Sequence, residues 1–455
     1  MPVETIHCDG SNPQQRSVLH HPRAPIIALL MILVTFASLS SAVLLLTPAW
    51  EANDEPDHVR NVITLVQGEW YNIEDGAGLE AHQPPLYYLL LAVWHRALDL
   101  ESRYPEPTSS GQALLGGAFF NHDYDDAASD DRLARALRIP SVVAGLATVA
   151  LTYATAHRLS KNRWTPVVAA AFVATLPKFV FLAGVVNNDN LVALLGAALA
   201  YLVTRFIMDP PQTALAGRLG GAAIGAVYGM LVLTKVSTIP LLVGAAVAAA
   251  LIGRRQQDIT GVGVAFTVAT VTVTGWWLLR NQARYGDPLA AKASNEYFEP
   301  LDIFGTDVEA AQRLLIDIPK TVYHSFYYTS GWNQFSWETP WYIPFWVLLG
   351  AGLIALRRRP RRDNQVPGQD IALVLVSALV LGALSSLWIV GVANSFSGTL
   401  QARLAFSGLA ALGCLFALGL ERAATPVIFS FVLPLLGLMG TSYALWDDVW
   451  RIFHT

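Results

Sequence analysis

The acidic segment 51–58, Glu-Ala-Asn-Asp-Glu-Pro-Asp-His, contains the side chains with the clearest capacity for chemistry. It follows directly on the apolar run 25–48. Asp54 and Glu55 fall where a helix would begin, because Pro56 suits a first helical turn. Capping of free N–H groups explains one carboxylate there, but not several beside a histidine. Asp54 or Glu55 could take a proton from an attacking hydroxyl or bind a divalent cation, and the segment leaves both roles open.

A second acidic edge is predicted at Asn187-Asn188-Asp189-Asn190, which is a turn by composition. By itself the segment needs no explanation beyond a polar turn that caps the next helix. The alternation of predicted membrane spans, however, puts Asp189 on the same side as Asp54 and Glu55. Two separated acidic edges on one face can share a metal ion or a substrate.

Basic and histidine side chains are predicted on that same face, mostly near helix ends. Charges near a membrane are costly and tend to line a polar cavity, although snorkelling to the headgroups explains a single arginine equally well. Gln401-Ala-Arg403 closes a polar loop and opens a span, where a guanidinium could hold a phosphate in bidentate fashion. His58 and His82 could also ligate a metal, although their spacing is not diagnostic. The candidate substrate-binding residues are His58, His82, Lys178, Lys235, Arg280, Arg403 and Gln401.

Membrane helices must position these residues. The 455 residues are 53% hydrophobic and only 14% charged, whereas about a quarter of a soluble protein is charged. Many apolar runs reach the length of about 18 residues that a membrane helix needs. The chain is therefore predicted to be an all-α polytopic membrane protein with about 11 transmembrane helices. The predicted spans are 26–47, 139–155, 164–186, 191–207, 220–233, 236–252, 261–279, 341–356, 371–392, 404–420 and 427–445.

The distribution of arginine predicts which loops lie on which side. Arg16 and Arg23 keep the N-terminus inside, and the five arginines within 357–362 are the strongest positive-inside signal. Residues 56–67 are too short to span and are predicted to lie in the interface, while 86–93 is interfacial or re-entrant. The predicted divisions are a cytoplasmic tail 1–24, a transmembrane domain 25–445 with outer loops 48–138 and 281–340, and a short outer tail 446–455.

Other classes of protein find less support in the sequence. No basic block with interleaved aromatic residues is present, which argues against a nucleic-acid partner. Cys8 and Cys414, the only cysteines, lie in a polar tail and an apolar span, so neither a disulfide nor a cysteine metal site is expected. Nucleotide-binding fingerprints are absent. A transporter or flippase, or a non-catalytic subunit of envelope polysaccharide assembly, stays as the alternative, although transporters often show internal repeats and this chain shows none.

Several short motifs, in order along the chain, resemble those of the GT-C membrane glycosyltransferases that use polyprenyl-phosphate sugars. This superfamily includes protein O-mannosyltransferases and the aminoarabinose transferases of lipid A. The resemblance runs from the first span to about residue 410. The motifs are Asp54-Glu55 followed by His58, His82-Gln-Pro-Pro-Leu-Tyr-Tyr, Asn188-Asp189, Trp277-Leu-Leu-Arg280-Asn281, Tyr285-Gly-Asp-Pro288 and Gln401-Ala-Arg403.

The resemblance implies a GT-C-like fold and glycosyltransferase activity. Asp54 would act as the general base or position the acceptor. Glu55 and Asp189 would support it or bind a divalent cation, Mg²⁺ or Mn²⁺, and Arg403 would hold the donor phosphate. The implied reaction is inverting transfer of a sugar from polyprenyl phosphate at the extracytoplasmic face of the cell membrane. Larger members have a sizeable soluble C-terminal domain that is missing here, so the acceptor stays open among glycolipids, polysaccharides and proteins.

Overall fold

The computed structural model describes residues 23–52, 54–73, 80–104, 124–295, 308–329, 342–358, 366–393, 401–423 and 439–443. The predicted tails 1–24 and 446–455 therefore lie almost entirely outside the described residues, together with Cys8 and part of each predicted outer loop. The predicted division of the chain into tails, loops and a transmembrane domain stays a prediction.

Helices account for all the regular structure in the described part of the chain. The long ones are α2 (Ala24–Leu46), α5 (Tyr124–Leu159), α8 (Asp189–Met208), α9 (Ala214–Thr234), α10 (Leu242–Arg255), α11 (Ile259–Tyr285), α16 (Gln369–Ala393) and α17 (Leu409–Arg422). The shorter ones are α3 (Glu55–Val66), α4 (Leu86–Ala97), α6 (Thr165–Ala174), α7 (Pro177–Ala183), η2 (Val236–Leu241), α12 (Ala291–Asn295), α13 (Val308–Gln312), η3 (Arg313–Asp317), α14 (Ile318–Ser325), α15 (Ile343–Ala355) and η7 (Ala402–Gly408). The predicted all-α class is confirmed.

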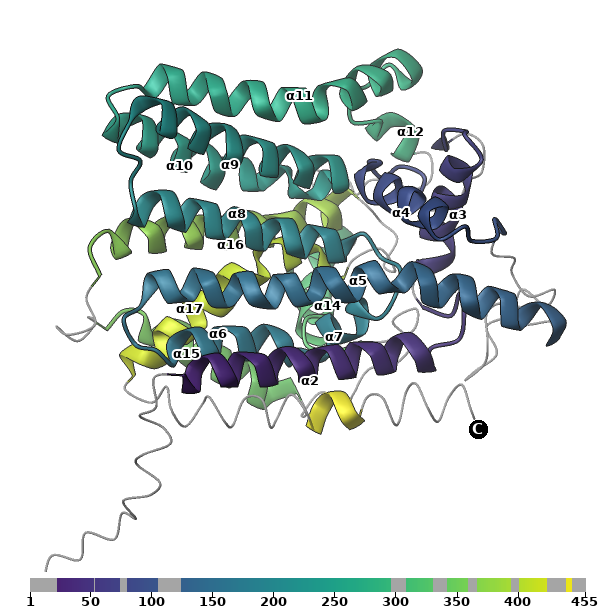
Figure 1. Ribbon diagram of the computed structural model, residues 1–455, viewed down its shortest axis with the longest axis horizontal. Coiled ribbons are helices and arrows are strands. Elements are labelled where there is room, and N and C mark those ends of the chain that lie inside the picture. The colour runs from purple at the N-terminus through teal and green to yellow at the C-terminus, as the bar shows by residue number, and fades with distance from the viewer. Residues whose placement is uncertain are drawn as a thin grey trace, which may run out of the picture.

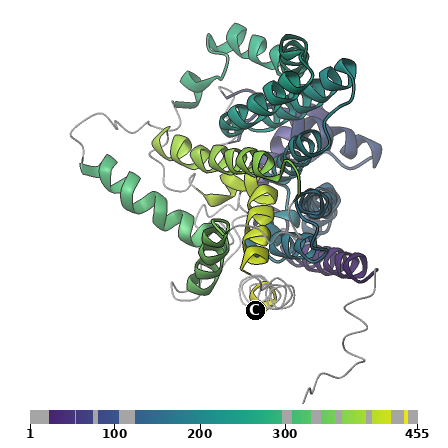
Figure 2. The same ribbon diagram turned by 90° about the vertical axis from the view of Figure 1, so that its left-hand side faces the viewer.

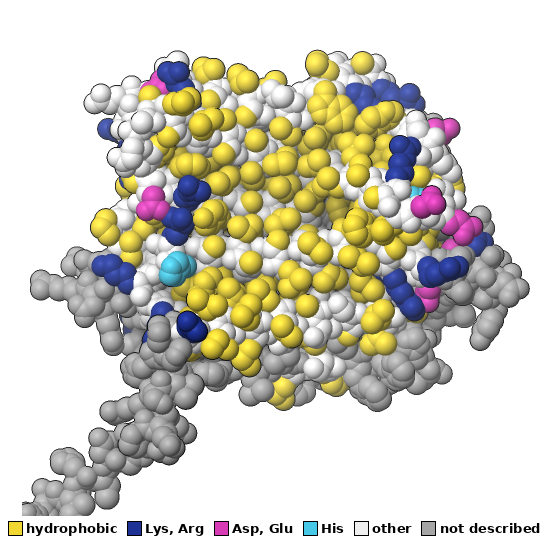
Figure 3. All heavy atoms as spheres, in the orientation of Figure 1, with side chains coloured by type: hydrophobic (Ala, Val, Ile, Leu, Met, Phe, Trp, Pro, Cys, Tyr) yellow, Lys and Arg dark blue, Asp and Glu magenta, His cyan; other side chains and the backbone are white. Residues whose placement is uncertain are grey.

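The long helices lie side by side, and α3 and α4 lie together at one end of them, which we call the α3 end (Figure 1). Hydrophobic side chains cover the middle of the face shown in Figure 3, whereas charged side chains gather toward the two ends of the helices. Exposed apolar side chains such as Val34, Leu219 and Val268 are unfavourable in water but suit contact with lipid. The protein is a multi-pass membrane protein.

Eight helices among the described residues are long and apolar enough to cross a membrane, and the bent pair of α6 and α7 adds a ninth if it forms one span. Helix α15 is also apolar but has only 13 residues. Together these segments overlap every predicted span except 427–445, most of which lies outside the described residues. The predicted number of 11 spans therefore stays a prediction.

The two short helices of the first loop occur close to where the sequence predicts them. Helix α3 carries Pro56 in its first turn, as expected from the missing N–H of proline. Helix α4 has 12 residues, which is too short to cross a bilayer. These helices bring the acidic segment 51–58 over one end of the bundle (Figure 1).

Proline also bends the span that α6 and α7 form. Pro177 begins α7, and Leu176 before it has extended backbone, because a residue that precedes proline disfavours the helical conformation. The two halves meet at 65°. The side chain of Lys178, one residue after the bend, is buried in the protein.

Helix α17 and the 3₁₀-helix η7 before it form the centre of the bundle. Within the apolar stretch Ala402–Arg422, 94% of the most apolar 18-residue window is buried, and Figure 2 shows this stretch in yellow in the middle of the molecule. Phe416 packs on Phe172 with ring centroids 4.9 Å apart. Arg403, in the first turn of η7, is thus attached to the most enclosed element of the fold.

Candidate active site

Four charged side chains from distant segments meet at the α3 end and form a continuous chain of ion pairs. The guanidinium of Arg403 bonds to Asp54, and its Nε lies 3.5 Å from Oδ2 of Asp189. Nζ of Lys235 lies 2.7 Å from the other oxygen of Asp189 and 3.3 Å from the side-chain oxygen of Asn188. We call Asp54–Arg403–Asp189–Lys235 the ion-pair chain. Its side chains are between 1% and 14% exposed, so the attractions are only weakly screened by water.

Helix ends explain why these charges gather here. Asp189 is the first residue of α8, and Asp54 is the N-cap of α3, so both carboxylates face positive ends of helix dipoles. Lys235 follows the last turn of α9, where a cation is favoured. Asp54 has a left-handed backbone with φ of 62°, a conformation that aspartate accepts more readily than most residues.

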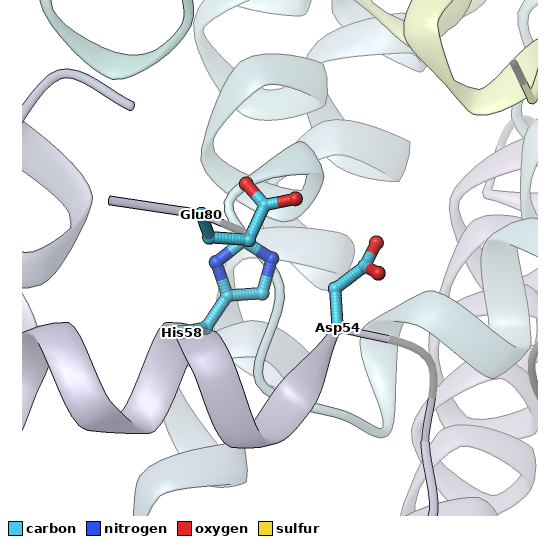
Figure 4. A group of neighbouring side chains, drawn as sticks. All are labelled: Asp54, His58 and Glu80. Carbon is cyan, nitrogen blue, oxygen red and sulfur yellow. The ribbon is translucent and has the colours of Figure 1, made fainter. Parts of the chain in front are cut away.

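Asp54 also belongs to a second group, with His58 and Glu80 (Figure 4). One ligand atom from each of the three side chains lies within 4.8 Å of the others, so they could share one metal ion. Asp54 and His58 are one helical turn apart at the start of α3, and Glu80 comes from the loop before α4. Nδ1 of His58 lies 2.9 Å from the hydroxyl of Tyr88.

Burial changes the ionisation of this group. It lowers the pKa of His58 well below its ordinary value, and the positive charges of Lys235 and Arg403 lower that pKa further. Burial also raises the pKa of Glu80 to about 8, and the negative charge of Asp54 adds to the increase. Without a bound cation, the imidazole of His58 is therefore neutral at neutral pH, while Glu80 mostly keeps its proton.

Glu55, the neighbour of Asp54, takes no part in the ion-pair chain. Its carboxylate is fully buried and bonds to Arg138 at 2.7 and 2.5 Å. Of the residues predicted to bind metal, Glu55 is thus paired with Arg138, and Asp189 with Lys235 and Arg403. Among the described residues, Asp54, His58 and Glu80 form a group whose ligand atoms could share one ion, and the predicted metal role of Glu55 and Asp189 stays a prediction.

Three of the predicted binding residues lie beside the ion-pair chain or in the loop before α4. Lys178 donates to the carbonyl and the hydroxyl of Thr329, at 2.8 and 3.0 Å. The side chain of Gln401 is buried, and its Oε1 has no hydrogen-bond partner among the described residues. Nε2 of His82 lies 3.0 Å from the side-chain amide nitrogen, Nε2, of Gln83.

Arg280, near the end of α11, is not a member of the ion-pair chain. It donates to the side-chain oxygen of Asn72 at 2.7 Å. Its guanidinium lies 4.6 Å from the ring centre of Trp277 and 5.7 Å from that of Trp70. An arginine between tryptophans at a helix end suits the membrane–water interface.

Sequence reasoning missed two residues, Glu80 and Arg138. Glu80 lies two residues before the predicted His82 motif, but an acid in a polar loop is common, and only the fold shows that it approaches Asp54. Arg138 did have a signal, since it stands directly before the predicted span 139–155. A charge at such a position is costly unless it is paired.

Comparison with known proteins adds to this geometry. The family model described as dolichyl-phosphate-mannose-protein mannosyltransferase matches residues 38–282. No curated protein matches the sequence. The fold is similar to that of ArnT from Cupriavidus metallidurans bound to undecaprenyl phosphate, with a TM-score of 0.51, 14% identity, and coverage of 88% of this chain and 61% of that chain. The apo state of ArnT gives a TM-score of 0.49, 14% identity, and coverage of 86% and 59%. For the Saccharomyces cerevisiae protein O-mannosyltransferase Pmt1–Pmt2 complex bound to the sugar donor, the TM-score is 0.39 and the sequence identity is 15%. The match covers 61% of this chain and 36% of that chain.

These likenesses differ in what they establish. At 14% identity, the similarity to undecaprenyl-phosphate-bound ArnT establishes a shared fold, and this chain spans 61% of the length of that protein. The family match includes Asp54, Asp189 and Lys235, whereas Arg403 lies beyond it. Because that match covers more than half of the chain, the protein belongs to the dolichyl-phosphate-mannose-protein mannosyltransferase family, within the GT-C superfamily that its motifs resemble.

Proposed function

We propose that this protein is a membrane glycosyltransferase that transfers a sugar from a polyprenyl-phosphate donor to an acceptor, with inversion at the anomeric carbon. The main support is the position of Arg403, which is shared between Asp54 and Asp189. That position puts a phosphate-binding group directly beside a carboxylate that can accept a proton. Membership of a family named for a polyprenyl-phosphate sugar, and the likeness to an undecaprenyl-phosphate-bound fold, support the class of donor.

The proposed reaction is a single displacement. A nucleophilic group of the acceptor, such as a hydroxyl, attacks the anomeric carbon from the face opposite the phosphate. A new C–O bond forms as the bond between the anomeric carbon and the phosphate oxygen breaks, and the electron pair leaves with the lipid phosphate. Asp54 accepts the proton of the attacking hydroxyl as general base. Attack opposite the leaving group inverts the configuration.

Arg403 offers a way for the donor to activate this base. A carboxylate paired with a guanidinium is a weaker base than an unpaired one. The phosphodiester of the donor has the charge and geometry that a guanidinium prefers, so donor binding draws Arg403 away from Asp54. As the bond to the sugar breaks, the phosphate gains a second negative charge, which Arg403 and Lys235 stabilise.

A divalent cation, Mg²⁺ or Mn²⁺, fits the group formed by Asp54, His58 and Glu80. Two carboxylates and a neutral imidazole are suitable donors for such an ion. Glu80 supports this fit, because its Oε2 is buried without a hydrogen-bond partner among the described residues. A bound cation would supply positive charge to the site.

We place the active site at the extracytoplasmic face of the cell membrane. The arginine pattern puts the loops of the α3 end outside and those of the opposite end inside. The acceptor is then a glycolipid, a polysaccharide or a protein that reaches this face, and the outer loops 48–138 and 281–340 are the segments available to recognise it.

The test is sugar transfer by the purified protein in liposomes, with a series of polyprenyl-phosphate sugars and acceptors. With one of these donors, we expect the glycosylated acceptor and free polyprenyl phosphate to form together. Asp54→Asn should abolish this transfer, whereas the matched control Asp209→Asn should not, because Asp209 pairs with Arg158 at the opposite end of α8. Near-normal transfer by Asp54→Asn would refute the role of Asp54 as general base. Uptake of lipid or anion into the liposomes without formation of a glycosylated product would favour a transporter.

A further inference from the structure

Arg138 occupies a buried junction between helices. It belongs to α5, its side chain is 1% exposed, and it donates five hydrogen bonds within the described residues. Three go to main-chain carbonyls at the end of α2, those of Leu44 at 3.0 Å, Thr47 at 2.6 Å and Pro48 at 2.9 Å. The other two go to the carboxylate of Glu55.

These bonds join the end of one helix to the start of the next. The last carbonyls of a helix have no partners within it, and Arg138 satisfies such groups at the end of α2. Glu55 is the first residue of α3, where a carboxylate is favoured by the helix dipole. Its Oε1 also accepts from the backbone N–H of Val186, at 2.9 Å. The turn 47–54 is therefore attached at both of its ends to a single side chain of α5.

That turn ends in Asp54 and includes unfavourable backbone. Asp54 has φ of 62°, and Trp50 in the same turn has φ of 67°. Such conformations persist only where the surrounding structure enforces them. A second residue of α5 also contacts this turn, because the backbone N–H of Ala49 donates to Oδ1 of Asp131 at 3.3 Å. Arg138 differs in that it bonds to both the end of α2 and the first residue of α3.

We propose that Glu55 and Arg138 are positioning residues, which hold the turn 47–54 so that Asp54 reaches the proton of the acceptor. This inference rests on the proposed function of Asp54 as the base. Glu55 itself is not available for chemistry, since both of its oxygens accept from Arg138 and one also accepts from Val186. A base needs a lone pair within hydrogen-bonding reach of its substrate.

Two conservative variants and a control test the proposal. Arg138→Lys keeps the charge but cannot contact the carboxylate and the carbonyls at once, and Glu55→Gln keeps the shape of the side chain. Arg158→Lys is the matched control, because it changes an ion-paired arginine of the same helix in its last turn, away from the turn before α3. In Arg138→Lys and Glu55→Gln, we expect kcat per folded molecule to fall by about 100-fold, because a displacement of a reacting group by about 1 Å lowers the rate by that much. The donor KM should stay within about twofold of the wild-type value. The control should keep its kcat.

Hydrogen exchange provides a second measurement that does not depend on activity. In Arg138→Lys and Glu55→Gln, the amides of residues 47–58 should exchange faster, while those of α9 and α11 keep their wild-type rates. Unchanged exchange at 47–58 together with wild-type kcat would overturn the proposal. So would faster exchange in all helices alike, because that result indicates a general loss of stability.

The two proposals can fail separately. If the wild-type protein transfers no sugar from any donor, the proposed function fails, and the exchange rates still decide whether the pair holds the turn. If the single variants do not fold, the double variant Glu55→Leu/Arg138→Met removes both charges and avoids a lone buried ion. A folded double variant should have the same low kcat, and wild-type kcat in that variant would overturn the inference.

Discussion

Asp54 and Glu55 are adjacent, and each pairs with an arginine, but the two pairs differ in how fully their hydrogen bonds are satisfied. Glu55 and Arg138 are 0% and 1% exposed, and the guanidinium donates five hydrogen bonds. Asp54 and Arg403 are 14% and 7% exposed, and Nε of Arg403 has no hydrogen-bond partner among the described residues.

The difference indicates which pair can exchange partners. A buried pair with all of its hydrogen bonds satisfied loses many contacts if either side chain moves, so it suits a fixed structural role. An arginine shared between two carboxylates, with donor capacity to spare, can transfer to an incoming phosphate at lower cost. The comparison thus assigns ligand exchange to Asp54 and Arg403 and a structural role to Glu55 and Arg138.

The largest expected effect is that of Asp54→Asn on catalysis. Loss of a general base should lower kcat by about 10²–10⁴-fold, while the free energy of unfolding changes by about 1 kcal/mol or less. Transfer assays and chemical unfolding in mixed micelles measure the two quantities. A large loss of stability with little loss of kcat would reverse the roles that the comparison assigns.

Arg138→Met should differ from Asp54→Asn by a large loss of stability, in addition to the loss of kcat expected when the turn before α3 is displaced. It leaves the carboxylate of Glu55 buried without its cation, which costs about 3–5 kcal/mol of unfolding free energy. Arg403→Met, at the more exposed pair, should cost clearly less. Unfolding of both variants under the same conditions tests this, and equal losses would show that the two pairs do not differ as described.

Arg403→Lys should weaken donor binding by a smaller amount. Lysine keeps the charge but loses the bidentate contact, so we expect the donor KM to rise about 10-fold, which corresponds to the loss of one charge-assisted hydrogen bond. The kinetics of Arg280→Lys serve as the control, since Arg280 lies near Trp277 and outside the ion-pair chain. A KM that rises only in the control would place the phosphate near Arg280 instead.

The smallest expected effect concerns Glu80 and pH. Because burial raises the pKa of Glu80 to about 8, the folded state without a cation holds this proton more tightly than the unfolded state does. The resulting stabilisation is complete at low pH and is lost as pH rises through about 8. In EDTA, the unfolding midpoint of the wild type should therefore fall by roughly 2–4 °C relative to that of Glu80→Gln between about pH 5 and 8. Parallel unfolding midpoints across this range would contradict the shift, and added Mn²⁺ should stabilise wild type alone.

Much of the architecture follows from local sequence patterns. Apolar runs predict membrane helices because each helix satisfies its own backbone hydrogen bonds, whatever lies beside it. Pro56 and the short length of the apolar run 86–93 likewise predict short helices in the first loop. The alternation of spans then puts Asp54, Asp189 and Arg403 at one end, where the structure brings them together.

The sequence by itself determined the helical class, the approximate spans and the end at which the charges gather, since these depend on composition, periodicity and chain direction. Local sequence could not separate Asp54 from Glu55, because adjacent carboxylates at a helix start are alike, and only the family resemblance gave them different roles. Only the packing of α5 against α2 and α3 brings Arg138 to Glu55. Only the fold of the first loop brings Glu80 to His58. Contacts between distant segments depend on how helices pack, which no local pattern specifies.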